Sequence, residues 1–192
     1  MNTDKKLMLS SDIKSKGGKK MSSFTHFLEK EILEHHIRNE TLYMGLSRQD
    51  GNRQGDFADW VEDGEGGWEV EDDGIDEVGE GKVYDEETET WVDESTPSYS
   101  RVAVTSTDWH EVEVVLGEEG DSEVRISTDI DFGALTEEDE DWGTVSHFFL
   151  ADSDTEGAGN ILAYGTMPDS VHLVEGMEAK IWGNTIVIRM TD

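Results

Sequence analysis

The 192-residue chain contains no cysteine and only two prolines. Without cysteine, neither disulfide bonds nor thiolate metal sites can stabilise the fold. Long hydrophobic runs are also missing, because no apolar stretch approaches the roughly 20 residues of a membrane-spanning helix. The run Leu7-Met8-Leu9 is too short for the apolar core of a signal peptide, so we expect no export by that route. An ordinary hydrophobic core must therefore hold the protein together.

Basic residues are scarce, with 15 Lys and Arg against 46 Asp and Glu, and the formal net charge is -31. Affinity for nucleic acid depends on Lys and Arg that displace counterions from the phosphate backbone. Most of this surface therefore repels nucleic acid, which we do not expect as a partner. The exception is the start of the chain, where six of the nine lysines lie: Lys5, Lys6, Lys14, Lys16, Lys19 and Lys20.

High net charge with modest hydrophobicity is also the signature of intrinsic disorder. The apolar residues argue against disorder, because they alternate along the second half of the chain and are accompanied by six Trp. A salt-rich habitat explains the acidity better, since a Debye length of about 3 Å at molar ionic strength suppresses self-repulsion. The alternating residues include Val112, Val114, Leu116, Val124 and Ile126.

The first half predicts a basic arm, a helix and a strand. Residues 1–20 have no periodicity and are typical of a tail. Ser22 or Ser23 can cap a helix that ends near Asn39, and a period of two from Thr41 predicts a first strand through Leu46. Three- and four-residue spacing puts one apolar face on the helix: Phe24, Phe27, Leu28, Ile32, Leu33 and Ile37.

Residues 50–98 read as an acidic insertion, with Gly and carboxylates dominating. Its second part predicts a small hairpin in which Tyr84 and Trp91 form a cross-strand pair. Residues 59–79 fit either a loop or a weak strand. The aromatic area of Trp60, Trp68 and Trp91 either nucleates a small subdomain, which we favour, or anchors a partner.

After Pro97 the chain predicts a succession of short strands, over 99–107, 110–116, 123–128, 144–151, 160–166, 171–174, 177–182 and 185–190. This spacing indicates a mainly β fold, an antiparallel β-sandwich of jelly-roll-like type with one short N-terminal amphipathic helix. Gly183-Asn184 predicts a tight hairpin that makes the last two strands antiparallel neighbours. We expect a β-sandwich domain over 21–49 and 99–192, interrupted by the insertion.

Several segments resemble one known family. The helix from Phe24, the strand around Tyr43, and the runs 141–148 and 159–165 are similar to tail-fibre-like and head-fibre-like minor structural proteins of tailed phages and related tailed viruses. The insertion replaces what is normally a short loop there, and the basic arm precedes the usual start. The resemblance implies a β-sandwich particle component, and its motif residues are Tyr99, Arg101, Trp142, Gly143, His147, Phe148, Asn160, Tyr164 and Gly165.

Candidate chemical sites are few. Asp152, Asp154 and Glu156 begin like a calcium loop, but Ala163 stands where a bidentate acid is needed, so a plain acidic turn is favoured. The histidines, among them His110 and His147, lack the spacing of a helical zinc site and are read as structural. No phosphate loop or nucleophile elbow is present. We therefore expect no cofactor, no metal and no enzymatic activity.

The resulting hypothesis is a structural component of a tailed-virus virion, most simply on the capsid exterior as a turret, spike or decoration protein. A compact domain with a tethering arm suits a shell, whereas fibres tend to show long repetitive shafts. A tail fibre or baseplate component is the alternative. Homo-oligomers and contacts with the major capsid protein or tail proteins are expected, but no membrane. The competing class is a carbohydrate-binding module that attaches to host glycans, and a small hydrolase is a third alternative. The predicted assembly interface comprises Lys16, Lys19, Lys20, Phe24 and Phe27.

The acidity generates a prediction about salt. We expect the fold to loosen when salt is lowered from molar to millimolar concentration, because unscreened carboxylates then repel one another. Far-UV circular dichroism measures this directly. A spectrum that stays the same over that range contradicts the halophilic interpretation.

Overall fold

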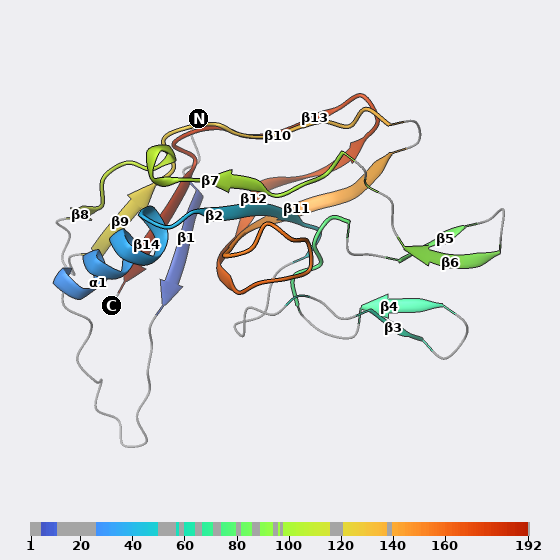
Figure 1. Cartoon of the computed structure of the whole chain (residues 1–192), viewed down its shortest axis with the longest axis horizontal. Helices are drawn as coiled ribbons and strands as arrows, with labels where there is room; N and C mark the ends of the chain where they lie inside the picture. The colour runs from blue at the N-terminus through green and yellow to red at the C-terminus, as the bar shows by residue number, and fades with distance from the viewer. Residues whose placement is uncertain are drawn as a thin grey trace, which may run out of the picture. The chain divides into compact units, whose positions relative to one another are not determined.

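The structure is a computed structural model that describes residues 5–10, 26–49, 57, 60–63, 67–70, 74–79, 82–85, 89–93, 96, 98–115, 121–137 and 140–191 (Figure 1). Contacts group the chain into two compact units. The first comprises Met1–Thr41, Val104–Asp129 and Ile181–Asp192, and the second comprises Leu42–Ala103 and Ile130–Lys180. The domain bounds expected from the sequence stay a prediction.

The first unit is built on a four-stranded sheet with the order β1-β14-β9-β8. These strands are β1 (Lys5–Ser10), β14 (Ile186–Thr191), β9 (Asp121–Arg125) and β8 (Glu113–Val115). β1 runs parallel to β14, whereas β14, β9 and β8 pair antiparallel. Its buried side chains come largely from alternating β-branched residues, which suit a pleated sheet: Val124, Ile126, Ile186 and Ile188. A short 3₁₀ turn, η2 (Ser106–Asp108), also belongs to this unit.

A helix contacts β9 and β8 of the same unit. It starts as α1 (His26–Ile32) and widens into a π-helix, η1 (Leu33–Arg38). Glu29, Leu33 and Ile37 are buried, whereas Phe27 is 74% exposed and Leu28 41%. The predicted single apolar face is therefore wrong, because the residues that pack inward follow the four-residue spacing from Glu29. The buried Glu29 carboxylate accepts a hydrogen bond from Ser122 Oγ at 3.2 Å.

The second unit contains a four-stranded sheet with the order β12-β11-β2-β7 and a two-stranded sheet, β10-β13. The larger sheet consists of β12 (Ile161–Val174), β11 (Asp141–Ala151), β2 (Leu42–Ser47) and β7 (Val102–Val104). The smaller consists of β10 (Ile130–Ala134) and β13 (Glu178–Ile181). The largest fully buried side chains of this unit include Trp142, Phe149, Leu42, Met44 and Leu150.

Two hairpins lie in the segment predicted to be an acidic insertion. They are β3 (Trp60–Glu62) with β4 (Trp68–Val70), and β5 (Lys82–Asp85) with β6 (Thr90–Asp93). Tyr84 pairs with Trp91 in the β5–β6 register, so the predicted cross-strand pair is confirmed. Of the two alternatives for residues 59–79, the weak strand is the one that forms.

The expected fold class is confirmed, since the chain is mainly β, with antiparallel sheets and one short helix. Some strand predictions were wrong. β10 was missed, β1 lies in the predicted tail, and residues 160–166 and 171–174 form the single strand β12 with irregular register. None of the helices among the described residues is long and apolar enough to cross a membrane.

The predicted hairpin at Gly183-Asn184 is also wrong, because β13 pairs with β10 while β14 pairs with β9 and β1. A tight turn does form, with Asn184 at φ +64°. Its backbone is held elsewhere, since Asn184 N–H donates to Ile126 O at 2.7 Å and Gly183 N–H donates to Asp129 Oδ1 at 2.8 Å. A Cβ on Gly183 would lie 2.6 Å from Ser127 O, so only glycine permits this approach.

Candidate functional site

The second unit contains a fully buried ion pair between Arg101 and Glu77. Arg101 Nη2 lies 2.6 Å from Glu77 Oε2 and both side chains are 0% exposed. Arg101 Nε donates to Glu77 Oε1 at 2.8 Å, which makes the pair bidentate. A planar guanidinium matches both carboxylate oxygens, and such charge-assisted bonds are the strong class of protein hydrogen bonds.

Tyr99 completes the polar centre. Its hydroxyl donates to Glu77 Oε1 at 3.0 Å and accepts a bond from Leu46 N–H of β2, also at 3.0 Å. Burial, and next the negative charge of Glu77, raise the pKa of Tyr99 well above its ordinary value. The phenol therefore stays protonated and keeps its donor role at every physiological pH.

Aromatic rings flank the guanidinium. The Arg101 Cζ atom lies 5.0 Å from the ring centroid of Phe57 and 5.1 Å from that of Phe149. The two rings meet edge to face with centroids 5.6 Å apart. A cation within about 6 Å of a ring centroid is attracted by the ring quadrupole, so the apolar surroundings also stabilise the charge.

The same ion pair holds the loop between β11 and β12. Arg101 Nη1 donates to Ser153 O at 2.7 Å and to Ala158 O at 2.8 Å. In return, Gly157 N–H donates to Glu77 Oε2 at 2.8 Å. Two segments distant in sequence, one carrying Glu77 and the other this loop, are therefore joined through one buried charge pair.

Asp152 closes the base of this loop. Its Oδ1 accepts a hydrogen bond from Asn160 N–H and its Oδ2 one from Asn160 Nδ2, both at 2.7 Å. These bonds from Asn160 lower the pKa of Asp152. Both oxygens are thus engaged in shaping the turn, and within the described part of the chain no three His, Asp or Glu side chains gather as a possible metal site.

A second polar cluster surrounds Glu140. Trp142 Nε1, whose side chain is fully buried, donates to Glu140 Oε1 at 2.9 Å, and Ser98 N–H donates to the same oxygen at 3.0 Å. Burial alone would raise the pKa of Glu140, but the bonds from Ser98 and Trp142 outweigh it and lower the pKa. Tyr99 joins the two clusters, because its ring meets that of Trp142 edge to face at 5.2 Å.

The structure places the remaining motif residues in or beside these strands. Gly143 has φ +72°, and a Cβ there would lie 3.0 Å from Arg48 Cδ, so the position favours glycine. His147 Nδ1 lies 2.7 Å from Ser146 Oγ. Phe148 is buried and pairs with Gly165 in the β11–β12 register, and Tyr164 pairs with Phe149.

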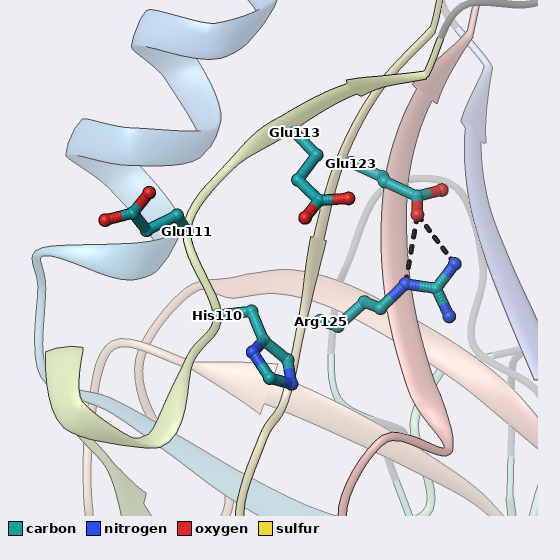
Figure 2. Close-up of a pocket in the computed structure, with 5 residues that line it drawn as sticks. All are labelled: His110, Glu111, Glu113, Glu123 and Arg125. Atoms are coloured by element: carbon teal, nitrogen blue, oxygen red, sulfur yellow. Dashed lines mark hydrogen bonds and ion pairs between the residues drawn. The ribbon is translucent and has the colours of Figure 1, made fainter.

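The first unit has a shallow pocket of about 200 Å³ lined by His110, Glu111, Glu113, Glu123 and Arg125. Figure 2 shows Glu123 joined to Arg125 beside Glu113, with His110 on the neighbouring segment. Arg125 Nη2 lies 2.7 Å from Glu123 Oε1, and Arg189 bonds Glu123 Oε2. Burial opposes ionisation, but the bonds from Arg189 and then Arg125 outweigh it and lower the pKa of Glu123.

This pocket is poorly suited to acid–base catalysis. A general acid needs a raised pKa, and Glu123 has the opposite shift because two arginines hold it ionised. His110 Nε2 is engaged with Asn184 Oδ1 at 2.7 Å. The pocket is therefore best described as a charged surface hollow.

The predicted assembly residues Lys16, Lys19, Lys20 and Phe24 lie outside the described residues, as do Ser22 and Ser23. Phe27 is the most exposed of the large apolar side chains that the structure describes, at 74%, followed by Trp182 at 65%. An exposed apolar side chain of this size is available for contact, and the role of Phe27 in assembly stays a prediction.

Sequence reasoning missed Glu77 and Phe57, which lie in the segment predicted to be an insertion. Ile75, Asp76, Glu77 and Val78 are all buried. A signal was present, because two apolar residues bracket Asp76 and Glu77 in a run otherwise made of Gly and acids. Such a bracketed pair of carboxylates indicates a segment that packs against a core.

Comparison with known proteins gives one match. The family model described as Podophage GP4 fiber I protein gp80 matches residues 83–189. The comparisons with curated proteins and with solved structures found no match. The matched range includes Tyr99, Arg101 and Trp142 but begins after Phe57 and Glu77.

Removing either member of the buried pair should destabilise the protein. Arg101→Met leaves Glu77 charged and uncompensated, which typically costs about 3–5 kcal/mol. The double variant with Glu77→Leu removes both charges and should recover part of this loss. Urea unfolding in molar salt, followed by tryptophan fluorescence, measures the stability of the unchanged chain, of Arg101→Met and of the double variant.

An exposed pair of the same unit serves as the control. Lys180 Nζ lies 3.6 Å from Asp131 Oδ2, and the side chains are 30% and 60% exposed. Lys180→Met should cost less than about 1 kcal/mol, as is usual for surface ion pairs. Equal losses for Lys180→Met and Arg101→Met would refute the importance assigned to the buried pair.

Proposed function

The chain belongs to the family of the podophage GP4 fiber I protein gp80, and from this premise we propose that it is a structural protein on the outside of a tailed-virus particle. Family membership makes it a fibre-like structural protein and a virion component. The finer proposal is a place on the capsid exterior, as a turret, spike or decoration protein. Its role is contact, and we expect no catalytic step.

The observation that carries this proposal is that the family range, residues 83–189, covers Arg101 and the strands around it. Arg101 fixes the β11–β12 loop by donating hydrogen bonds to two of its backbone carbonyl oxygens, those of Ser153 and Ala158. A loop fixed in this way loses little conformational entropy when a neighbour binds, which favours rigid contact surfaces. A protein that acts by surface complementarity needs such preorganisation.

The charge distribution supports attachment through the start of the chain. Lys16, Lys19 and Lys20 belong to the basic segment, while the chain as a whole carries a net charge of -31. Charge contrast of this kind steers association and fixes orientation more than it adds affinity. A tethering segment with a compact body suits a shell, and the described strands show no repeated unit of the kind that forms a long fibre shaft.

Cross-linking mass spectrometry on purified particles tests the location. A lysine-reactive reagent is well matched to this chain, because six of its nine lysines lie among residues 1–20. We expect cross-links from Lys16, Lys19 or Lys20 to the major capsid protein. Cross-links to tail proteins without any to the capsid protein would instead assign the chain to the tail.

A second candidate function is glycan binding, and the observation in its favour is Trp182. Its side chain is 65% exposed on a turn that is fixed through Gly183 and Asn184. An exposed indole offers a flat apolar face for a sugar ring, and neutral sugars suit a surface that repels anions.

A glycan array tests this second candidate. If the function holds, the protein binds neutral glycans in molar salt and Trp182→Ala abolishes the signal, because the stacking face is lost. Phe27→Ala removes another exposed aromatic ring and should leave the signal unchanged. An array without any bound glycan, or equal loss in both variants, removes the candidate.

A further inference from the structure

We propose that residues 74–79, the strap, form a salt-dependent latch that holds the β11–β12 loop in molar salt and releases it as salt is lowered. The inference rests on the proposed function, because it names how the rigid contact surface of that function is regulated. The strap lies in the segment predicted to be an acidic insertion and outside the family range 83–189. In the structure it belongs to the second unit, together with β2 and the loop.

One end of the strap is seated on β2. The strap runs antiparallel to the end of this strand. Arg48 N–H donates to Asp76 O at 2.9 Å, and Val78 N–H donates to Leu46 O at 3.1 Å. The Arg48 guanidinium adds a bidentate contact, with Nε 3.0 Å from Asp76 Oδ2 and Nη2 3.0 Å from Oδ1. Backbone bonds and an ion pair therefore act together at this end.

The strap also carries the carboxylate that holds the loop. Ile75 and Val78 are 1% and 0% exposed, and Ile75 packs in a cluster with Phe149. Between them in the sequence, Glu77 accepts the hydrogen bond from Gly157 N–H of the loop. The strap cannot leave β2 without withdrawing this carboxylate, so strap and loop open together.

Opening of the strap does not leave a buried charge unpaired. The closed state is favoured by the burial of Ile75 and Val78 and by the complete set of bonds at Glu77. When the strap opens, the charges of Glu77 and Arg101 return to water, and their hydration offsets much of the attraction that is lost. A six-residue segment with this balance opens locally more readily than a paired sheet does.

The charge around the strap makes its seating depend on salt. Residues 50–98 contain 19 Asp and Glu but only two Lys and Arg. Salt screens the exposed carboxylates of this segment, such as Glu62 and Glu89. It screens the Glu77–Arg101 pair much less, because both side chains are 0% exposed. Added salt therefore relieves the repulsion around the strap and leaves the buried attraction in place.

The state of the latch follows from the range of the repulsion. The Debye length is about 3 Å in molar salt and about 30 Å at 0.01 M. In molar salt we expect the strap to be seated and the loop to be as well protected as the sheet. As salt is lowered, we expect strap and loop to open before the sheet does. The loop then regains conformational freedom that binding must remove, so its contact with a neighbour weakens.

Amide hydrogen exchange of Asp76→Asn tests the coupling in molar salt. The substitution removes the charge that pairs with Arg48 and leaves the side chains that contact the loop unchanged. We expect the amides of Val78 and Gly157 to exchange faster by about tenfold or more, the effect of weakening one charge-assisted contact. Amides of the β11–β2 ladder should keep their protection.

Asp131→Asn is the matched control. Asp131 belongs to the ion pair with Lys180 in the same unit, and its side chain is 60% exposed. This variant makes the same chemical change and should leave the exchange of Val78 and Gly157 unaltered. Equal effects of the two substitutions on Gly157 overturn the proposal. An Asp76→Asn chain in which Gly157 exchanges as in the unchanged chain overturns it as well.

A salt titration of the unchanged chain tests the latch itself. As salt falls from molar to millimolar concentration, Val78 and Gly157 should lose protection together, at a higher salt concentration than the β11–β2 ladder does. Loss of all protection in one step contradicts a separate latch. Loss at different salt concentrations for Val78 and Gly157, or full protection of both in millimolar salt, contradicts it too.

Thiol labelling gives an independent measurement, since the chain has no cysteine. Val78 and Leu150 are 0% and 1% exposed, so Val78→Cys reports opening of the strap and Leu150→Cys reports opening of β11. We expect Val78→Cys to react about tenfold or more faster in millimolar than in molar salt, while Leu150→Cys stays slow. Equal acceleration of both thiols rejects the latch. Circular dichroism in molar salt checks that each variant is folded.

Failure of the latch and failure of the proposed function are distinguishable. Mass spectrometry of purified particles tests whether the chain is a virion protein, whatever its response to salt. A chain that is present in particles but fails the exchange and labelling tests rejects the latch alone. Absence from particles rejects the proposed function and leaves the measured coupling of strap and loop unaffected.

Discussion

The second unit depends on one buried ion pair. The side chains of Glu77 and Arg101 have no solvent exposure, and they also form hydrogen bonds with Tyr99 and with the backbone of the β11–β12 loop. Buried charges are costly unless their partners are complete, so this set of contacts works only as a whole. It fixes the loop and joins the segment containing Glu77 to the sheet. A shape specified in this way suits a protein whose function is contact.

The sequence predicted the fold class because alternating apolar residues report directly on strands. It also predicted the pairing of Tyr84 with Trp91, since the two strands are adjacent along the chain and separated by a short polar run. It failed where pairing is non-local. The turn at Gly183-Asn184 is real, yet β13 and β14 join different sheets, and local turn chemistry carries no information about distant partners. The predicted apolar face of the helix was wrong because three- and four-residue spacing is compatible with two adjacent faces. Leu33 and Ile37 lie on the buried face, whereas Phe27 and Leu28 are exposed.

The site was predicted in part. Tyr99, Arg101 and Trp142 were singled out through resemblance. The structure places Tyr99 and Arg101 at the buried Glu77 carboxylate and Trp142 at the neighbouring Glu140 cluster. Their partner Glu77 was not singled out, because its charge does not distinguish it among 46 acidic residues, and the two apolar residues that bracket Asp76 and Glu77 were not read as a core signal. In so acidic a chain, charge alone does not identify Glu77, the acid that forms the buried ion pair.

Amide hydrogen exchange at Gly157 tests the central role of the buried pair most directly. Gly157 lies exposed in the β11–β12 loop, and its N–H donates to the fully buried Glu77 carboxylate at 2.8 Å. If the ion pair holds the loop, this amide exchanges as slowly as the amides of the paired strands β11 and β2, because opening it requires separating buried charges. Exchange as fast as that of an unprotected loop amide would contradict the account.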